Sequence, residues 1–273
     1  MTWKSCSCLG FGLLALLILP SSPLTAQQSD TVAKRLEDSP RHHEWANFKT
    51  ATGRTVRAFV VYPEVDAPAP AVVLIHENRG LTDWVRGVAD RFAEEGFVAI
   101  APDLLSEAGP ERGGTESFAN SDAARDALYA LTPEQVASDL DAAVDFIRKD
   151  QATSDKVAVI GFCWGGGQAF RCAAHADGIT AALVFYGPAP DRPLLEQIKA
   201  PVYGFYGGND FRITGQVPQT VAAMKELGKK YEAMIYEGAG HAFMRLGEEP
   251  GAAAANQKAM QQAWAKVLEV LKR

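Results

Sequence analysis

The chain has 273 residues, of which 47% are hydrophobic, and a formal net charge of −6. That length and apolar content suffice for one α/β domain with a large core. The acidic balance argues against binding to nucleic acid or to anionic lipid through charge.

An apolar segment at the N-terminus predicts export. Lys4 precedes an apolar run over residues 9–19, and residues 24–26 offer a small-residue cleavage site. This is a signal-peptide pattern, and the run is shorter than the ~20 residues that a spanning helix needs. We expect residues 1–26 to be removed, which would take the net charge to −7 and leave a periplasmic or secreted protein with no membrane contact. An uncleaved N-terminal anchor is the alternative.

Residues 27–44 are polar and predict a flexible lead-in to a single domain over residues 45–273. The adjacent His42 and His43 raise the question of a metal site. Neighbouring side chains of an extended chain point to opposite faces, so a solvated linker is the simpler interpretation. His76 beside Glu77 lacks the H-E-x-x-H spacing. We therefore expect no metal and no cofactor.

The rest of the chain alternates apolar strand patterns with helical patterns. Strands are expected over residues 57–62, 71–75, 97–101, 157–160, 180–186, 201–206 and 230–236. Helices are expected over residues 83–95, 217–227 and 252–271. A further helix should begin at Pro133, with Thr132 as its N-cap. The alternation predicts an α/β fold with a mostly parallel, doubly wound sheet covered by helices on both faces. Residues 106–120 form the one long irregular stretch, which we expect to rim the pocket; a disordered surface insertion is the alternative.

The segment Gly161-Phe162-Cys163-Trp164-Gly165 lies between an expected strand and a small-residue helix. This is the nucleophile elbow of an α/β-hydrolase, G-x-S-x-G, with sulfur in place of oxygen. The glycines are needed because the strained turn leaves no room for side chains beside the nucleophile. A buried structural cysteine is the alternative interpretation.

The order of such a triad places an acid and then a histidine after later strands. Asp210 follows the expected strand 201–206, and His241 follows the expected strand 230–236. The imidazole can take the thiol proton, and the carboxylate fixes its tautomer. A turn-forming aspartate and a surface histidine are the alternatives.

Two backbone amides are expected to stabilise the oxyanion. The N–H of Trp164 begins the helix after the nucleophile, and the second donor should follow an earlier strand, where Asn78 is the candidate.

On these motifs the chain resembles the dienelactone hydrolases, from about residue 45 to the C-terminus. The resemblance rests on the Glu77 loop, residues 101–104, the Cys163 elbow, residues 207–210, and residues 240–243 with Arg245. It implies an α/β-hydrolase fold and an esterase or lactonase of the carboxymethylenebutenolidase type that acts through an acyl-cysteine intermediate. It also implies that Glu77 helps to activate the thiol when substrate binds, and that Arg245 binds the substrate carboxylate and can pair with Glu77.

One departure from the family concerns substrate charge. The family carries a second carboxylate-binding arginine where this chain has Glu107. Arg112 could replace it only if the loop folds back. Because Arg245 attracts an anion and Glu107 repels one, we expect neutral and acidic substrates to be accepted about equally well.

The expected mature enzyme is a monomer that acts on a small ester or lactone. It retains Cys163 and Cys172, which are too far apart on one helix for a disulfide. Two other classes of function stay open: a non-catalytic binding protein on a hydrolase fold, and a thiol redox protein, although no C-x-x-C motif is present.

Overall fold

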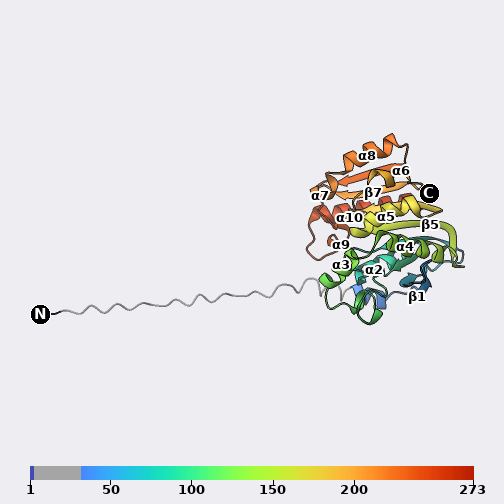
Figure 1. The fold of residues 1–273 in the computed structure, drawn as a ribbon, viewed down its shortest axis with the longest axis horizontal. Coiled ribbons are helices and arrows are strands. Elements are labelled where there is room, and N and C mark those ends of the chain that lie inside the picture. Colours follow the sequence, from blue (N-terminus) through green and yellow to red (C-terminus); the bar gives the residue numbers. More distant parts are fainter. Residues whose placement is uncertain (3–31) are drawn as a thin grey trace.

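The computed structural model describes residues 1–2 and 32–273 (Figure 1). The expected signal peptide therefore lies, apart from its first two residues, outside the described residues. Over the described part of the chain, no helix is long and apolar enough to cross a membrane.

The core of the described chain is an eight-stranded sheet in the order β1-β2-β4-β3-β5-β6-β7-β8. The strands are β1 (His43–Lys49), β2 (Thr55–Val61), β3 (Ala69–Ile75), β4 (Val98–Pro102), β5 (Thr153–Phe162), β6 (Ile179–Phe185), β7 (Val202–Gly207) and β8 (Tyr231–Tyr236). At one edge, β2 pairs antiparallel with both β1 and β4. The other six strands, β3 to β8, run parallel to one another. Because parallel strands end at the same edge, the loops after β3, β5, β6, β7 and β8 gather there.

Helices cover both faces of this sheet, as the alternating pattern predicted (Figure 1). They are α2 (Asp83–Glu94), α3 (Ser121–Tyr129), α4 (Pro133–Arg148), α5 (Trp164–His175), α6 (Arg192–Glu196), α7 (Phe211–Thr214), α8 (Val217–Glu226), α9 (Phe243–Leu246) and α10 (Ala254–Leu271). One buried cluster packs α4, α5 and α8 on one face, and a second packs α2 and α10 on the other. The α/β architecture predicted from the sequence is confirmed.

The start of α4 shows how local sequence determines an element. The Oγ1 of Thr132 accepts a hydrogen bond from the N–H of Gln135 at 3.2 Å, and Pro133 occupies the first turn. The predicted N-cap is therefore confirmed, since this oxygen satisfies a donor that the first turn leaves unpaired.

The expectation of a flexible lead-in up to residue 44 is wrong for its described part. Residues 32–37 are helical, and Val32 is buried. Arg41 donates to both carboxylate oxygens of Asp90 on α2, at 2.8 and 2.7 Å, and His43 lies 2.9 Å from the same carboxylate. His43 is therefore not a solvated linker residue, and the domain begins before residue 45. Arg41 and His43, two of the polar residues that suggested flexibility, bind a carboxylate.

The loop over residues 106–120 is tied to the sheet. Thr115 donates to the two carboxylate oxygens of Asp103 through its N–H and hydroxyl, at 2.7 Å each. Its hydroxyl also accepts from the N–H of Leu81 at 2.9 Å. Two short 3-10 turns, η1 (Pro110–Arg112) and η2 (Thr115–Ser117), form within the loop. The alternative of a disordered insertion therefore does not hold.

Candidate active site

Cys163 lies at a sharp turn between β5 and α5. Its backbone has φ 55° and ψ −113°, a region that residues with a side chain seldom occupy. A Cβ at Gly161 would lie 1.9 Å from the carbonyl oxygen of Gly165, and a Cβ at Gly165 would lie 2.4 Å from the carbonyl oxygens of Ile75 and His76. The flanking glycines are thus required because backbone fills the space on both sides.

The structure brings the three expected triad residues together. The Nε2 atom of His241 lies 3.1 Å from the Cys163 Sγ, and its Nδ1 atom lies 2.6 Å from the Asp210 Oδ2. Asp210 is buried directly after β7, while His241 follows β8 and is about a third exposed. With Asp210 ionised, His241 donates from Nδ1 and presents Nε2 as the acceptor for the thiol proton.

The thiol is held in its neutral form in the free protein. Burial raises the pKa of Cys163 to about 11, and the negative charge of Glu77 adds to the effect. The backbone N–H groups of Trp164 and Asn78 act in the opposite direction, because both hydrogen-bond to the sulfur. The two amides expected to form an oxyanion hole therefore converge on the nucleophile.

Glu77 and Arg245 form a partly buried ion pair beside the thiol. The Nε of Arg245 donates to the Glu77 Oε2 at 2.8 Å, and its Nη1 donates to Glu249 at 3.4 Å. The other carboxylate oxygen of Glu77 is buried and has no hydrogen-bond partner among the described residues. Because an unpaired buried acceptor is costly, a bound substrate or water is the natural partner for it.

His76 has a structural role next to Glu77. Its side chain is fully buried, and burial lowers its pKa, so the ring is neutral. Its Nδ1 donates to the carbonyl oxygen of Glu77 at 2.8 Å, and its Nε2 accepts from the N–H of Leu104 at 3.3 Å. Both ring nitrogens are thus used to join the loops after β3 and β4. Within residues 32–273, no group of three or more His, Cys, Asp or Glu side chains is placed to hold a metal ion.

Tyr186 is a site residue that the sequence did not reveal. It follows β6 with a φ of 40°, and its ring packs edge-on against that of His241 at 5.1 Å. Burial raises its pKa well above the usual value, and the Glu77 charge contributes. Its buried hydroxyl has no partner in the described chain. It is therefore a neutral, buried donor that makes no hydrogen bond within the described chain.

The two loop residues considered for substrate charge pair with each other. Arg112 lies 2.9 Å from Glu107, and this hydrogen bond lowers the pKa of the glutamate. Arg112 is 77% exposed along its side chain. Neither residue is among those that line the cavity beside Cys163 in the described chain. Arg112 therefore contacts Glu107 and does not line the cavity that holds the triad nucleophile.

The cavity at Cys163 has a volume of about 310 Å³, within the range of small-ligand sites. Its walls come from α5, the segment after β6, α7 and the end of α3. Among the described residues it is lined by Tyr129, Cys163, Trp164, Gly167, Gln168, Arg171, Tyr186, Pro188, Ala189, Pro190, Arg212 and Ile213. The loop over residues 106–120, expected to rim the pocket, contributes none of these; Tyr129, at the end of α3, does.

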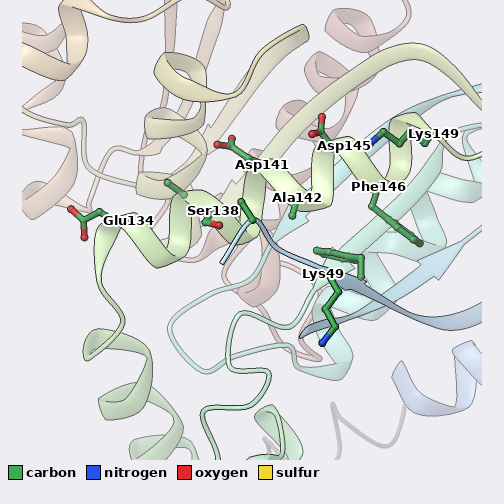
Figure 2. A pocket seen from close by; sticks show the side chains of 11 residues that line it. Lys49, Glu134, Ser138, Asp141, Ala142, Asp145, Phe146 and Lys149 are labelled. Carbon is green, nitrogen blue, oxygen red and sulfur yellow. The ribbon is translucent and has the colours of Figure 1, made fainter. Parts of the chain in front are cut away.

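A larger cavity lies elsewhere. Figure 2 shows this hollow of about 660 Å³, with side chains of α4 such as Asp141 and Phe146 on one side and Lys49 of β1 on the other. Asp141 is engaged by His175 at 2.8 Å. The residues described as lining it do not include Cys163, Asp210 or His241.

Comparisons with known proteins indicate a family for this chain. The model of the dienelactone hydrolase family matches residues 56–273. A protein of Escherichia coli K12, provisionally assigned as a carboxymethylenebutenolidase, is 30% identical over 80% of this chain and 84% of its own length. A protein of Saccharolobus solfataricus with the same provisional assignment is 32% identical over 83% of this chain and 97% of its own length.

Solved structures show the same fold. A provisionally assigned dienelactone hydrolase from Klebsiella pneumoniae superimposes with a TM-score of 0.73 at 23% identity, covering 85% of this chain and 99% of its own. A dienelactone hydrolase-like promiscuous phosphotriesterase from metagenomic libraries gives a TM-score of 0.71 at 21% identity, covering 85% and 98%. At these identities the likeness is one of fold.

Proposed function

This chain belongs to the dienelactone hydrolase family and is an ester or lactone hydrolase, and on that premise we propose that it acts through an acyl-enzyme intermediate on Cys163. The observation that carries the proposal is the continuous contact from Asp210 through His241 to the sulfur, at 2.6 and 3.1 Å. A neutral thiol is a poor nucleophile, so a base within hydrogen-bond reach is what the chemistry requires.

In the first half-reaction the Cys163 proton passes to Nε2 of His241 as the sulfur attacks the carbonyl carbon. The carbonyl oxygen becomes an oxyanion, which the amides of Trp164 and Asn78 stabilise. The carbon–oxygen bond of the ester then breaks, and the leaving oxygen takes the proton from His241. For a lactone, this oxygen stays attached to the acyl chain as a hydroxyl group.

In the second half-reaction water replaces the thiol. His241 takes a proton from the water as it attacks the thioester, and returns it to the departing sulfur. The product carboxylic acid leaves, and the free thiol is restored. Asp210 stabilises the imidazolium that forms in each half-reaction.

Glu77 keeps the enzyme inactive toward other electrophiles. Its charge, together with burial, holds the thiol protonated in the free enzyme. Binding of substrate against the unpaired Glu77 oxygen, or displacement of this carboxylate away from the sulfur, removes that opposition. Activation is thus linked to an occupied site.

The test is hydrolysis of a chromogenic short-chain ester and of an unsaturated lactone. Cys163→Ala should abolish turnover of both, whereas Cys172→Ala should not, because Cys172 is buried in α5 away from the cavity. Alkylation with iodoacetamide should inactivate the wild type and the Cys172 variant alike. Turnover in Cys163→Ala at the wild-type rate would contradict the proposal.

We also propose that the enzyme is exported. The support is the pattern of Lys4, an apolar run over residues 9–19 and the small residues before position 27. N-terminal sequencing of the protein from its source should find a chain that begins at about residue 27. A chain that still carries residues 1–26 would refute the cleavage.

A further inference from the structure

The cavity at Cys163 is basic although the protein is acidic. Its charged lining residues, among those that the structure describes, are Arg171 and Arg212, and no aspartate or glutamate lines it. The whole chain, by contrast, has 33 acidic and 27 basic side chains. An accumulation of one charge in a concave site raises the local concentration of the opposite charge.

The guanidinium groups of these two arginines are unpaired in the described part of the chain. Within the described chain, the guanidinium groups of Arg171 and Arg212 make no ion pair or hydrogen bond, whereas most other arginines pair with a carboxylate. Arg245, which family resemblance makes a carboxylate binder, is engaged by Glu77 and Glu249. The cations free to bind a ligand in this cavity are therefore different from the arginine that the sequence suggested.

Helix geometry directs Arg171 toward the nucleophile. Trp164, Gly167, Gln168 and Arg171 follow the i, i+3, i+4, i+7 spacing of one helix face, and all four line the cavity. Eight residues of helix place the Arg171 backbone about 12 Å from that of Cys163, and the arginine side chain can cover roughly half of this. At Gly167 an added Cβ would lie 3.3 Å from Pro188, so the glycine lets the opposite wall approach.

Arg212 approaches from the other side of the cavity. It lies in α7, two residues after the triad acid Asp210. Its positive charge lowers the pKa of Cys163, so it lies within electrostatic reach of the sulfur. The two arginines thus come from two different helices to line the cavity that contains the nucleophile.

We propose that Arg171 and Arg212 form an anion subsite that binds a carboxylate on the acyl part of the substrate, on the α5–α7 side of Cys163. The inference rests on the proposed hydrolase function and adds the place where a carboxylate of an ester or lactone substrate binds, the α5–α7 wall in place of Arg245. Two guanidinium groups can each donate to such a group, and Arg suits carboxylates because its fork matches their two oxygens. Acidic substrates are then preferred over neutral ones, in place of the equal acceptance expected from Arg245 and Glu107.

The test compares para-nitrophenyl hydrogen adipate with its neutral methyl ester, which differ only in the distant carboxylate. In the wild type, kcat/KM should be higher for the acid. In Arg171→Gln and in Arg212→Gln the ratio of acid to neutral kcat/KM should fall by about ten-fold each, as expected for loss of a charged hydrogen bond. The control Arg192→Gln removes an exposed arginine that pairs with Glu226 and should change neither the ratio nor the activity.

A second measurement does not depend on turnover. Cys163 is alkylated with iodoacetate, which is an anion, and with iodoacetamide, which is neutral. The ratio of the two rates cancels the intrinsic reactivity of the thiol. The iodoacetate-to-iodoacetamide ratio should be about three-fold or more lower in Arg212→Gln than in the wild type. Added salt should lower the ratio in the wild type, and it should lower the ratio of the variant less. If neither adipate ester is hydrolysed, the proposed function fails, while this ratio still tests the subsite.

An unchanged acid-to-neutral ratio in both arginine variants would overturn the proposal, as would a ratio that falls only in Arg245→Gln. The latter outcome would assign the carboxylate to the Glu77 side of the site.

Discussion

Replacement of Glu77 by glutamine should make Cys163 more reactive in the free enzyme. Burial and the Glu77 charge together raise the pKa of the thiol from 9.0 to about 11. Glu77→Gln removes the charge with little change of shape. The pKa of Cys163 should then fall but stay above 9.0, because burial is the larger cause and is unchanged.

The size of the effect follows from the thiolate fraction. At pH 8 a thiol of pKa 11 is about one part in a thousand ionised, against about one in ten for an unperturbed cysteine. Because a thiolate becomes more nucleophilic as its pKa rises, an increase of two pKa units makes the thiolate itself about ten-fold more reactive. This offsets part of the difference in thiolate fraction. Wild-type Cys163 should therefore be alkylated about ten-fold more slowly than a free thiol. The variant should be about three-fold faster than the wild type.

The assay is the rate of iodoacetamide incorporation between pH 7 and 10.5, followed by mass spectrometry of the peptide that contains Cys163. The wild-type rate should rise ten-fold per pH unit without a plateau below pH 10. Glu249→Gln is the matched control, since Glu249 also contacts Arg245 but is not a cause of the raised pKa. A plateau near neutral pH would show a preformed thiolate–imidazolium pair and refute the reasoning, as would an unchanged rate in Glu77→Gln.

Three further outcomes are expected. His241→Ala and Asp210→Asn should each lower kcat by about 10³-fold or more, and the double variant should be little worse than the poorer single variant; additive losses in steady-state kinetics would argue against a shared relay. Asp90→Asn should lower the free energy of unfolding by about 1–2 kcal/mol at pH 7 in urea titrations, because hydrogen bonds, chiefly from Arg41, outweigh burial and lower the pKa of Asp90 to about 2. Because the pKa of Asp90 is lower in the folded than in the unfolded protein, this stabilisation is present above pH 5 and is lost as the pH falls from 4 to 2. A difference in unfolding free energy between wild type and variant that is as large at pH 2 as at pH 7 would contradict the assignment. Gly165→Ala should cost about 1–3 kcal/mol and displace the elbow, because its Cβ would lie 2.4 Å from two carbonyl oxygens; an unchanged melting temperature and activity would refute this.

The elbow and its partners could be predicted because each depends on short-range sequence. The glycines around Cys163 are required by the turn itself, and Asp210 and His241 stand in the loops that follow β7 and β8. Parallel strands then bring these loops to one edge without further information. The sheet was predictable for the same reason, since each of its central strands contains a continuous buried run.

The basic cavity could not be predicted in this way. Arg171 and Arg212 are 41 residues apart in the sequence and line one cavity only because the fold places α5 and α7 at its walls. The helical spacing of Trp164, Gln168 and Arg171 was a usable signal, because it places Arg171 on the face that carries the residue after the nucleophile.

The edge of the sheet was missed for a different reason. β1 has one buried side chain, Phe48, so its sequence lacks the apolar alternation of a core strand. Its place is set by pairing with β2 and by the contacts of His43 and Arg41 with Asp90, which are distant in sequence. Polarity in this segment indicated flexibility only because the partner carboxylate could not be seen.

The central claim is that the acyl group passes through Cys163. It is tested most directly by acid quench of the wild-type enzyme within its first turnovers of an activated aryl ester, followed by mass spectrometry of its peptides. The account predicts one acyl group on the peptide that contains Cys163, which appears with the burst of aryl alcohol and decays when the ester is exhausted. Sustained turnover with an unmodified Cys163 peptide, or with the acyl group on another residue, would contradict it.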